Sequence, residues 1–200
     1  MRGFLVVLAM GLVLLALAAL RDRHTRRLAE AQLGIPLERL GATPAGTPDE
    51  SQQAALDAFR TAQPRFDAPL ADERFASWAS PATLELTDVD LLCCAEGVGS
   101  RRELMDSLAV ARRTGRHLVV VCPAPEESLV GLLASAPSGT ARTPLLVADP
   151  QTCSALAQAT GGRPATRADL QSGAAPSGHG KARRLVADAT GCWVQGPDES

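Results

Sequence analysis

The fold of this chain is decided by residues 90–133, which read DLLCCAEGVGSRRELMDSLAVARRTGRHLVVVCPAPEESLVGLL. Two runs within this stretch, residues 91–94 and 118–122, are short, continuous and apolar. Strands that are covered on both faces of a sheet have this composition, whereas half-exposed strands alternate apolar and polar residues. The residues between the two runs are numerous enough for a crossover helix, so we expect the two strands to pair in parallel.

Two helices are predicted around the second of these strands. Ser100 and Glu103 have the spacing of a capping box, and Gly115 follows a basic turn, so the first helix should begin near Ser100 and end at Gly115. The second helix is predicted over residues 126–133, where four of the last five residues are apolar. The stretch is therefore a strand–helix–strand–helix unit.

Further elements are predicted on both sides of this unit. Residues 49–62 are typical of a short helix, which Pro64 stops. Near the C-terminus, residues 185–187 and 192–194 predict the two strands of a hairpin, joined by a turn at residues 188–191.

In their order and spacing these pieces resemble the apical domain of the group I chaperonins, the GroEL family. The strand at 91–92, the segment Arg102-Glu103-Leu104-Met105, the strand at 115–121 and the helix at 126–133 are similar to consecutive parts of that domain. Residues 65–67, 84–86, 156–162 and 180–186 are similar to other parts of it, in the same order, and the resemblance implies a strand at 84–86. The resemblance spans residues 65–195 and implies an α/β protein with the layered β/β/α apical-domain fold.

The resemblance also implies a function, because the family's apical domain binds polypeptide in an apolar groove between two helices and an extended segment. Carried over to this sequence, the groove residues are Leu70, Arg74, Phe75, Met105, Leu108, Leu129 and Leu133. Arg74 departs from the family, which has an aromatic residue there. We therefore expect polypeptide segments or a partner protein as ligands.

The residues themselves allow two interpretations of this groove. The second predicted helix is apolar over more than one face, so one face can pack on the sheet while another is left for a partner. The alternative is that both helices are simply buried, or that helix 49–62 covers the groove. The domain would then be a structural or assembly module that has kept the fold and lost peptide binding.

The sequence contains no match to the parts of a chaperonin that use ATP. The family's equatorial domain carries a GDGTTT segment, which is absent here, and the chain also lacks a GxxxxGK[ST] phosphate loop and a GxGxxG turn. We therefore expect binding without nucleotide, cofactor or catalysis. An enzyme built at the carboxyl edge of the sheet, using Asp88, Asp90 or Glu96, is a third interpretation, which lacks a convergent acid, base or nucleophile in the sequence.

The N-terminus predicts an attachment to the membrane. Residues 3–20 carry no charge, and at 1.5 Å per residue they would span about 27 Å, close to the thickness of a bilayer core. Arg21, Arg23, Arg26 and Arg27 follow, and positive flanks stay in the cytoplasm. We thus expect an uncleaved single-pass helix over residues 1–20 and a cytoplasmic domain, although the sequence Ala16-Leu17-Ala18 leaves a cleaved signal peptide and export open.

Between anchor and domain, residues 21–64 are interpreted as a basic juxtamembrane segment, a flexible tether and the short helix, and residues 196–200 as a tail. The net charge of −2 and the scattered arginines argue against nucleic acid as a partner. The five cysteines include no CxxC pair or Cys/His cluster with metal-ligand spacing, so no metal site is predicted. Cys93, Cys94 and Cys122 fall in predicted core strands, where cysteine acts as a small hydrophobe.

Overall fold

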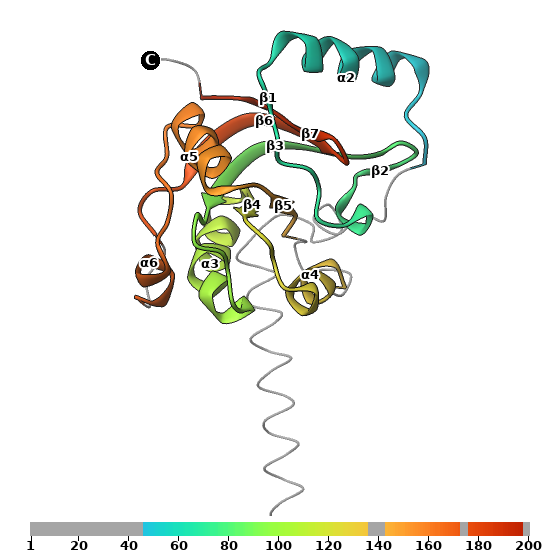
Figure 1. Ribbon diagram of the computed structural model, residues 1–200. Coiled ribbons are helices and arrows are strands. Elements are labelled where there is room, and N and C mark those ends of the chain that lie inside the picture. The colour runs from blue at the N-terminus through green and yellow to red at the C-terminus, as the bar shows by residue number, and fades with distance from the viewer. Residues whose placement is uncertain (1–45, 136–142, 173–175, 198–200) are drawn as a thin grey trace, which may run out of the picture. The chain divides into compact units, whose positions relative to one another are not determined.

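The computed structural model describes residues 46–135, 143–172 and 176–197 (Figure 1). The predicted membrane anchor, residues 1–20, and most of the tether lie outside these ranges. Among the helices that are described, none has the length and apolarity needed to cross a membrane.

Seven strands form one mixed sheet, as the predicted α/β class requires. Its order is β1-β7-β6-β3-β4-β5, and β2 pairs with β3 off this path. The strands are β1 (Arg65–Phe66), β2 (Trp78–Ala79), β3 (Ala82–Cys93), β4 (His117–Cys122), β5 (Leu145–Val147), β6 (Gly180–Asp188) and β7 (Gly191–Gln195).

The two predicted buried strands pair in parallel. Leu91 of β3 stands opposite Val119 of β4, and β4 pairs in parallel with β5. The hairpin near the C-terminus is also confirmed, with β6 and β7 antiparallel and Leu185 opposite Val194. One boundary differs from the prediction: residues 84–86 and 91–93 belong to a single strand, β3, which pairs with β6 along most of its length.

Residues 65–71 connect the two edges of the sheet. At one edge Phe66 in β1 stands opposite Cys192 in β7. At the other, the amide of Ala71 donates to the carbonyl of Leu145 at 2.9 Å, and Leu70 bridges to Leu146. Because one short segment pairs with both edges, it covers backbone groups that would otherwise be open to another chain.

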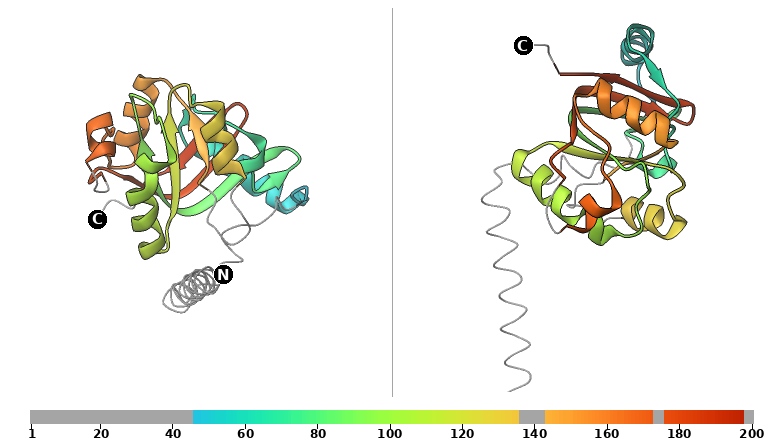
Figure 2. Two further views of the ribbon diagram at one scale, coloured as in Figure 1. Left: turned by 90° about the horizontal axis from the view of Figure 1, so that it is seen from below. Right: turned by 60° about the vertical axis from the view of Figure 1, so that its left-hand side comes forward.

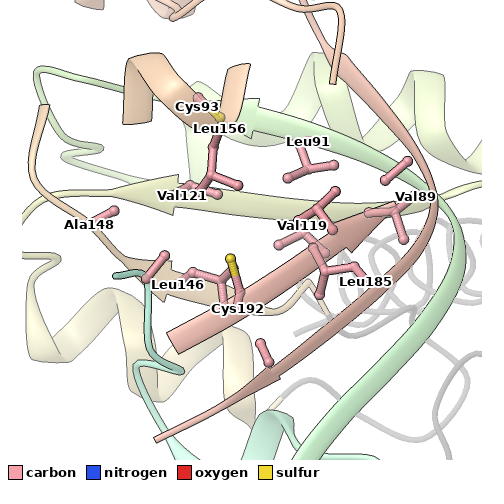
Figure 3. Close-up of a cluster of buried hydrophobic side chains, with 14 of the residues drawn as sticks. Val89, Leu91, Cys93, Val119, Val121, Leu146, Ala148, Leu156, Leu185 and Cys192 are labelled. Atoms are coloured by element: carbon pink, nitrogen blue, oxygen red, sulfur yellow. The ribbon is translucent and has the colours of Figure 1, made fainter. Parts of the chain in front are cut away.

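The sheet curls around an apolar interior (Figure 3). The interior side chains come from β3, β4, β5, β6 and β7 and point toward one another: Val89, Leu91, Cys93, Val119, Val121, Leu146, Leu185 and Cys192. Helix α5 (Pro150–Ala159) packs Cys153, Leu156 and Ala157 against them. The interior is thus aliphatic, as the low aromatic content of 3% requires.

Three helices cover the other face of β3, β4 and β5 (Figures 1 and 2). They are α3 (Met105–Thr114), α4 (Glu127–Ala134) and α6 (Arg167–Gln171), and α3 is preceded by the 3₁₀ turn η3 (Arg101–Leu104). Their buried side chains join Leu92, Val120 and Leu145 of the sheet in a second cluster, the helix-side core. A further 3₁₀ turn, η2 (Glu73–Phe75), adds Phe75 to this core.

The predicted N-terminal helix of the domain is α2 (Glu50–Ala62). Asp49 caps it by accepting from the amide of Gln52, and Gln52 in turn accepts from the amide of Asp49. Leu56 and Phe59 of α2 pack on Val186 and Trp193 of the hairpin. Since α2 lies against β6 and β7, it does not cover the predicted groove between α3 and α4.

The ends of α3 show one prediction confirmed and one wrong. Gly115 ends the helix in the left-handed conformation, with φ of 69°, as a C-cap glycine does. Ser100 makes no side-chain capping bond; instead, the carboxylate of Glu103 accepts from the amide of Gly99 at 2.9 Å. The capping box assumes an α-helical first turn, and here that turn is 3₁₀.

Candidate functional site

The three segments predicted to form the groove converge on the helix-side core. Phe75 from η2, Leu108 from α3, and Leu129 and Leu133 from α4 belong to this one cluster, and Leu70 packs against it. These segments are far apart in the sequence, and the fold brings them together in one cluster.

Burial separates the seven predicted groove residues into two groups. Phe75, Leu108, Leu129 and Leu133 are only 2–7% exposed, so they pack in the core and do not line an open groove in this structure. Leu70 is half-buried, whereas Arg74 and Met105 are exposed, Met105 to 48%. A bound peptide could therefore contact Met105 and Arg74, but not the four core residues.

Leu132 is an exposed apolar residue that the sequence analysis missed. Its side chain is 50% exposed. In the described residues, Leu132 and Met105 are the two large hydrophobic side chains that are exposed. Met105 lies at the start of α3 and Leu132 on α4, so each of the two helices presents one. A helical period of 3.6 residues places Leu132 about 100° from Leu133, but α4 is apolar over both faces, so no sequence signal marks Leu132 as the exposed one.

Arg74 is held in place by polar contacts. Its guanidinium donates to both carboxylate oxygens of Asp72, at 2.9 and 2.7 Å, and reaches the hydroxyl of Ser135 at the end of α4, at 3.5 Å. These bonds, chiefly the side-chain bond from Arg74, lower the pKa of Asp72. The result is a polar connection between η2 and α4 beside the buried leucines.

A second polar cluster lies where α3 meets the start of β6. The hydroxyl of Ser107 and Nε2 of His179 are 3.0 Å apart, and Asp90 accepts from Nε of Arg116 at 2.6 Å. Burial lowers the pKa of His179, although the nearby carboxylate of Asp90 opposes this shift. A serine beside a histidine can be a nucleophile, but Ser107 is fully buried in this structure.

The other carboxylates considered for an enzyme also make structural contacts. Asp88 lies 3.8 Å from Arg116, and Glu96 accepts from the backbone amide of Arg167 at 2.9 Å. Within the described ranges, no group of three or more His, Cys, Asp or Glu side chains could hold a metal ion.

All five cysteines are buried and none forms a disulfide. Burial is the main cause that raises the pKa of each thiol, to about 12 for Cys93 and Cys153 and to about 11 for Cys122. The pKa values of Cys94 and Cys192 are raised as well. A thiol with a raised pKa is a poor nucleophile at neutral pH, which agrees with the interpretation of these residues as small hydrophobes.

Comparison with known proteins finds similarity in structure. No protein-family model and no curated protein sequence matches the chain. The chaperonin gp146 from bacteriophage EL 2 (Pseudomonas aeruginosa) is similar in one crystal form with a TM-score of 0.51 and 11% identity, over 86% of this chain and 42% of that one. In a second crystal form the TM-score is 0.48 at 12% identity, over 66% of this chain and 28% of gp146.

This chain therefore has a mixed α/β fold like that of a chaperonin, and it spans less than half the length of the gp146 chains that it matches. At such low identity the likeness concerns the fold alone.

Proposed function

We propose that this domain binds segments of other polypeptides, without catalysis and without ATP, through an apolar surface on α3 and α4. The observation that carries the proposal is the chaperonin-like fold, shared with gp146 over 86% of the chain. The exposed side chains Met105 and Leu132, one on each helix, support it further. Arg74, which bonds to Ser135 after the end of α4, would supply a charged group at that end of the helix.

Such a surface would bind weakly. Fully burying one aliphatic side chain contributes roughly 1.5–3 kcal/mol to the free energy of binding. The loss of translational and rotational freedom on association opposes binding by some 4–15 kcal/mol. Met105 and Leu132 are already about half covered, so they would contribute less than the full value. Together the two side chains would contribute less than the cost of association, so one copy should bind no more tightly than the millimolar range, and useful binding would need additional contacts or several copies close together.

The membrane anchor that we propose for residues 1–20 would bring copies together. Chains that are confined to a membrane meet more often than chains in solution, which raises the effective concentration of their binding surfaces. We propose that the domain faces the cytoplasm, because four arginines follow the apolar segment.

The binding surface can be tested with full-length protein in detergent. The probe is a fluorescently labelled, reduced and carboxymethylated α-lactalbumin, which cannot fold. We expect the double variant Met105→Glu/Leu132→Glu to lose binding, because a charge on each helix opposes burial of the probe's apolar side chains. Because both side chains are only about half covered, each substitution should lower the free energy of unfolding by no more than about 1 kcal/mol.

The matched control is Ala58→Glu, an exposed position on α2, which lies on β6 and β7 and not on the helix-side core. This variant should bind the probe as the parent does. If the double variant also binds as the parent does, the surface on α3 and α4 is not the site.

The second candidate function is a structural or assembly module that keeps the fold without binding peptides. The burial of Phe75, Leu129 and Leu133 favours it, because these side chains would line the groove if it were open. Absence of probe binding by the parent protein itself, at concentrations up to the millimolar range, would support this alternative.

A further inference from the structure

The side of η3 and α3 that faces solvent is basic. Its exposed positions, here called the basic face, are Arg102, Met105, Ala109, Arg112 and Arg113. A helical period of 3.6 residues places these positions within an arc of about 100° on one side of the helix. The opposite side is buried in the helix-side core. Met105 is thus an apolar side chain with arginines before and after it on the same side of the helix.

The three arginines of the basic face have no partner within the described part of the chain. Their guanidinium groups form neither an ion pair nor a hydrogen bond with any described residue. Arg116, which follows α3, is different, because it pairs with Asp90 at 2.6 Å. The acidic residue of α3, Asp106, is half-buried at the border of the basic face and pairs with none of the three. The face therefore keeps an excess of positive charge.

Helix stability explains only part of this charge. Arg112 and Arg113 lie in the last turn of α3, where the helix dipole favours cations. Arg102 lies in η3, just before α3, and a cation near the N-terminus of a helix is unfavourable. Because its charge opposes the dipole and has no partner in the described residues, a role toward a ligand accounts for it better.

We infer that the basic face selects acidic segments of polypeptide. An apolar side chain of the segment would pack on Met105 while neighbouring carboxylates pair with the arginines. This inference rests on the proposed function and names the class of polypeptide that is bound. At 1.5 Å per residue, Met105 and Arg112 are about 10 Å apart along the helix, a distance that an extended segment spans in about three residues. A leucine three residues from a pair of glutamates therefore fits the face.

Charge complementarity favours a narrow polypeptide over an anionic membrane as the ligand. Helices α3 and α4 lie on the same side of the sheet, and α4 begins at Glu127, with Glu126 before it (Figure 2). Both glutamates are exposed. A flat anionic surface in contact with both helices would be repelled by these carboxylates, whereas a single extended segment can follow α3 alone.

The selectivity can be tested with two short peptides, GLSGEEG and GLSGQQG, which differ only in the two charges. Their Kd values for the full-length protein in a neutral detergent are measured by saturation-transfer NMR, which detects ligands in the millimolar range. We expect the acidic peptide to bind about fivefold more tightly, because exposed ion pairs are individually weak. In about 0.5 M NaCl the ratio of the two Kd values should approach one, since salt screens exposed charges.

Two variants assign the selectivity to the basic face. Arg112→Gln/Arg113→Gln removes two of its charges, and the ratio of the Kd values should fall below about twofold. The matched control is Arg112→Lys/Arg113→Lys, which keeps both charges at the same exposed positions and should retain the ratio. Glutamine and lysine have similar helix propensities, so the two variants should be equally folded.

Several results would overturn the inference. Equal Kd values of the two peptides for the parent protein would refute the selectivity and leave the proposed function standing. An unchanged ratio in Arg112→Gln/Arg113→Gln would show that other charges select the ligand. If dihexanoyl-phosphatidylserine, but not dihexanoyl-phosphatidylcholine, displaces GLSGEEG at concentrations below the Kd of the peptide, the face binds lipid head groups instead. If the parent binds neither peptide, the inference is wrong, and unfolded α-lactalbumin then tests the proposed function separately.

Discussion

Replacing Leu133 with alanine should destabilise the domain far more than the same change at the adjacent Leu132. Leu133 is 4% exposed in the helix-side core, whereas Leu132 is 50% exposed on the same turn of α4. The two variants have the same composition, and they alter the helix propensity in the same way. Any difference between them therefore measures burial alone.

The expected difference follows from the cost of a cavity. Replacing a buried leucine with alanine lowers the free energy of unfolding by about 2–5 kcal/mol. The folded protein loses the burial of the removed carbons, and neighbouring side chains fill the space only in part. At Leu132, where about half of the side chain is already in water, the loss should be under about 1 kcal/mol. In a domain of this size 1 kcal/mol corresponds to roughly 2–4 °C in Tm.

The assay is urea unfolding of the full-length protein in detergent, followed by tryptophan fluorescence and circular dichroism. The midpoint should fall clearly for Leu133→Ala and little for Leu132→Ala, with unchanged slopes. Equal, small effects at both positions would mean that Leu133 faces solvent in solution. The open groove expected from the chaperonin resemblance would then be correct, and the packing described here would be refuted.

Three further predictions concern the thiols, the histidines and nucleotide. The native cysteines of the folded protein should react with a thiol reagent at pH 8 far more slowly than those of the urea-unfolded protein, because they are buried and their pKa values are raised. Membrane topology is therefore better tested with the exposed variant Ser128→Cys. If the domain is cytoplasmic, an impermeant maleimide should leave this thiol unlabelled on intact cells. Burial lowers the pKa of His117 and of His179, so the unfolded chain binds protons more readily than the folded one. The free energy of unfolding should therefore be highest above a pH of about 6.5 and fall as the pH drops below it. Urea midpoints measured between pH 7.5 and 5 should show this fall, and they should fall less steeply for His179→Asn. Mg-ATP should not change the melting temperature. A ligand that binds the folded protein would raise its free energy of unfolding by about 2.7 kcal/mol at 100 times its Kd, so a clear thermal shift would reveal a nucleotide site.

Several elements of the fold could be predicted because their signals are local. The apolar runs at 91–93 and 118–122, the helix between them, Gly115 as its C-cap and the hairpin at 185–194 all appear as expected. In each case the signal lies within a few residues of the element that it specifies, so no distant contact is needed to interpret it. The capping box at Ser100 failed because its spacing is shared by a 3₁₀ turn.

The candidate site was predictable only in part. The chaperonin resemblance named residues of η2, α3 and α4, which share the helix-side core, and it named Met105, which is exposed. It could not establish whether Leu129 and Leu133 face a partner or the core. Both faces of α4 are apolar in sequence, so periodicity gives no preference between them, and the choice depends on how closely α4 approaches Phe75 and the sheet.

By itself, the sequence determined several of the elements, namely the buried part of β3, β4, α2, α3, α4 and the two hairpin strands. It also determined that β3 and β4 run in parallel and that the core is aliphatic, since caps, turns and apolar runs act over short distances along the chain. Only the tertiary structure decided that residues 65–71 pair with both edges of the sheet, that α2 lies on β6 and β7, and that Leu133 is buried while Leu132 is exposed. These features depend on contacts between residues far apart in sequence. An exposed and a buried leucine have the same side chain, and only the surrounding fold distinguishes them.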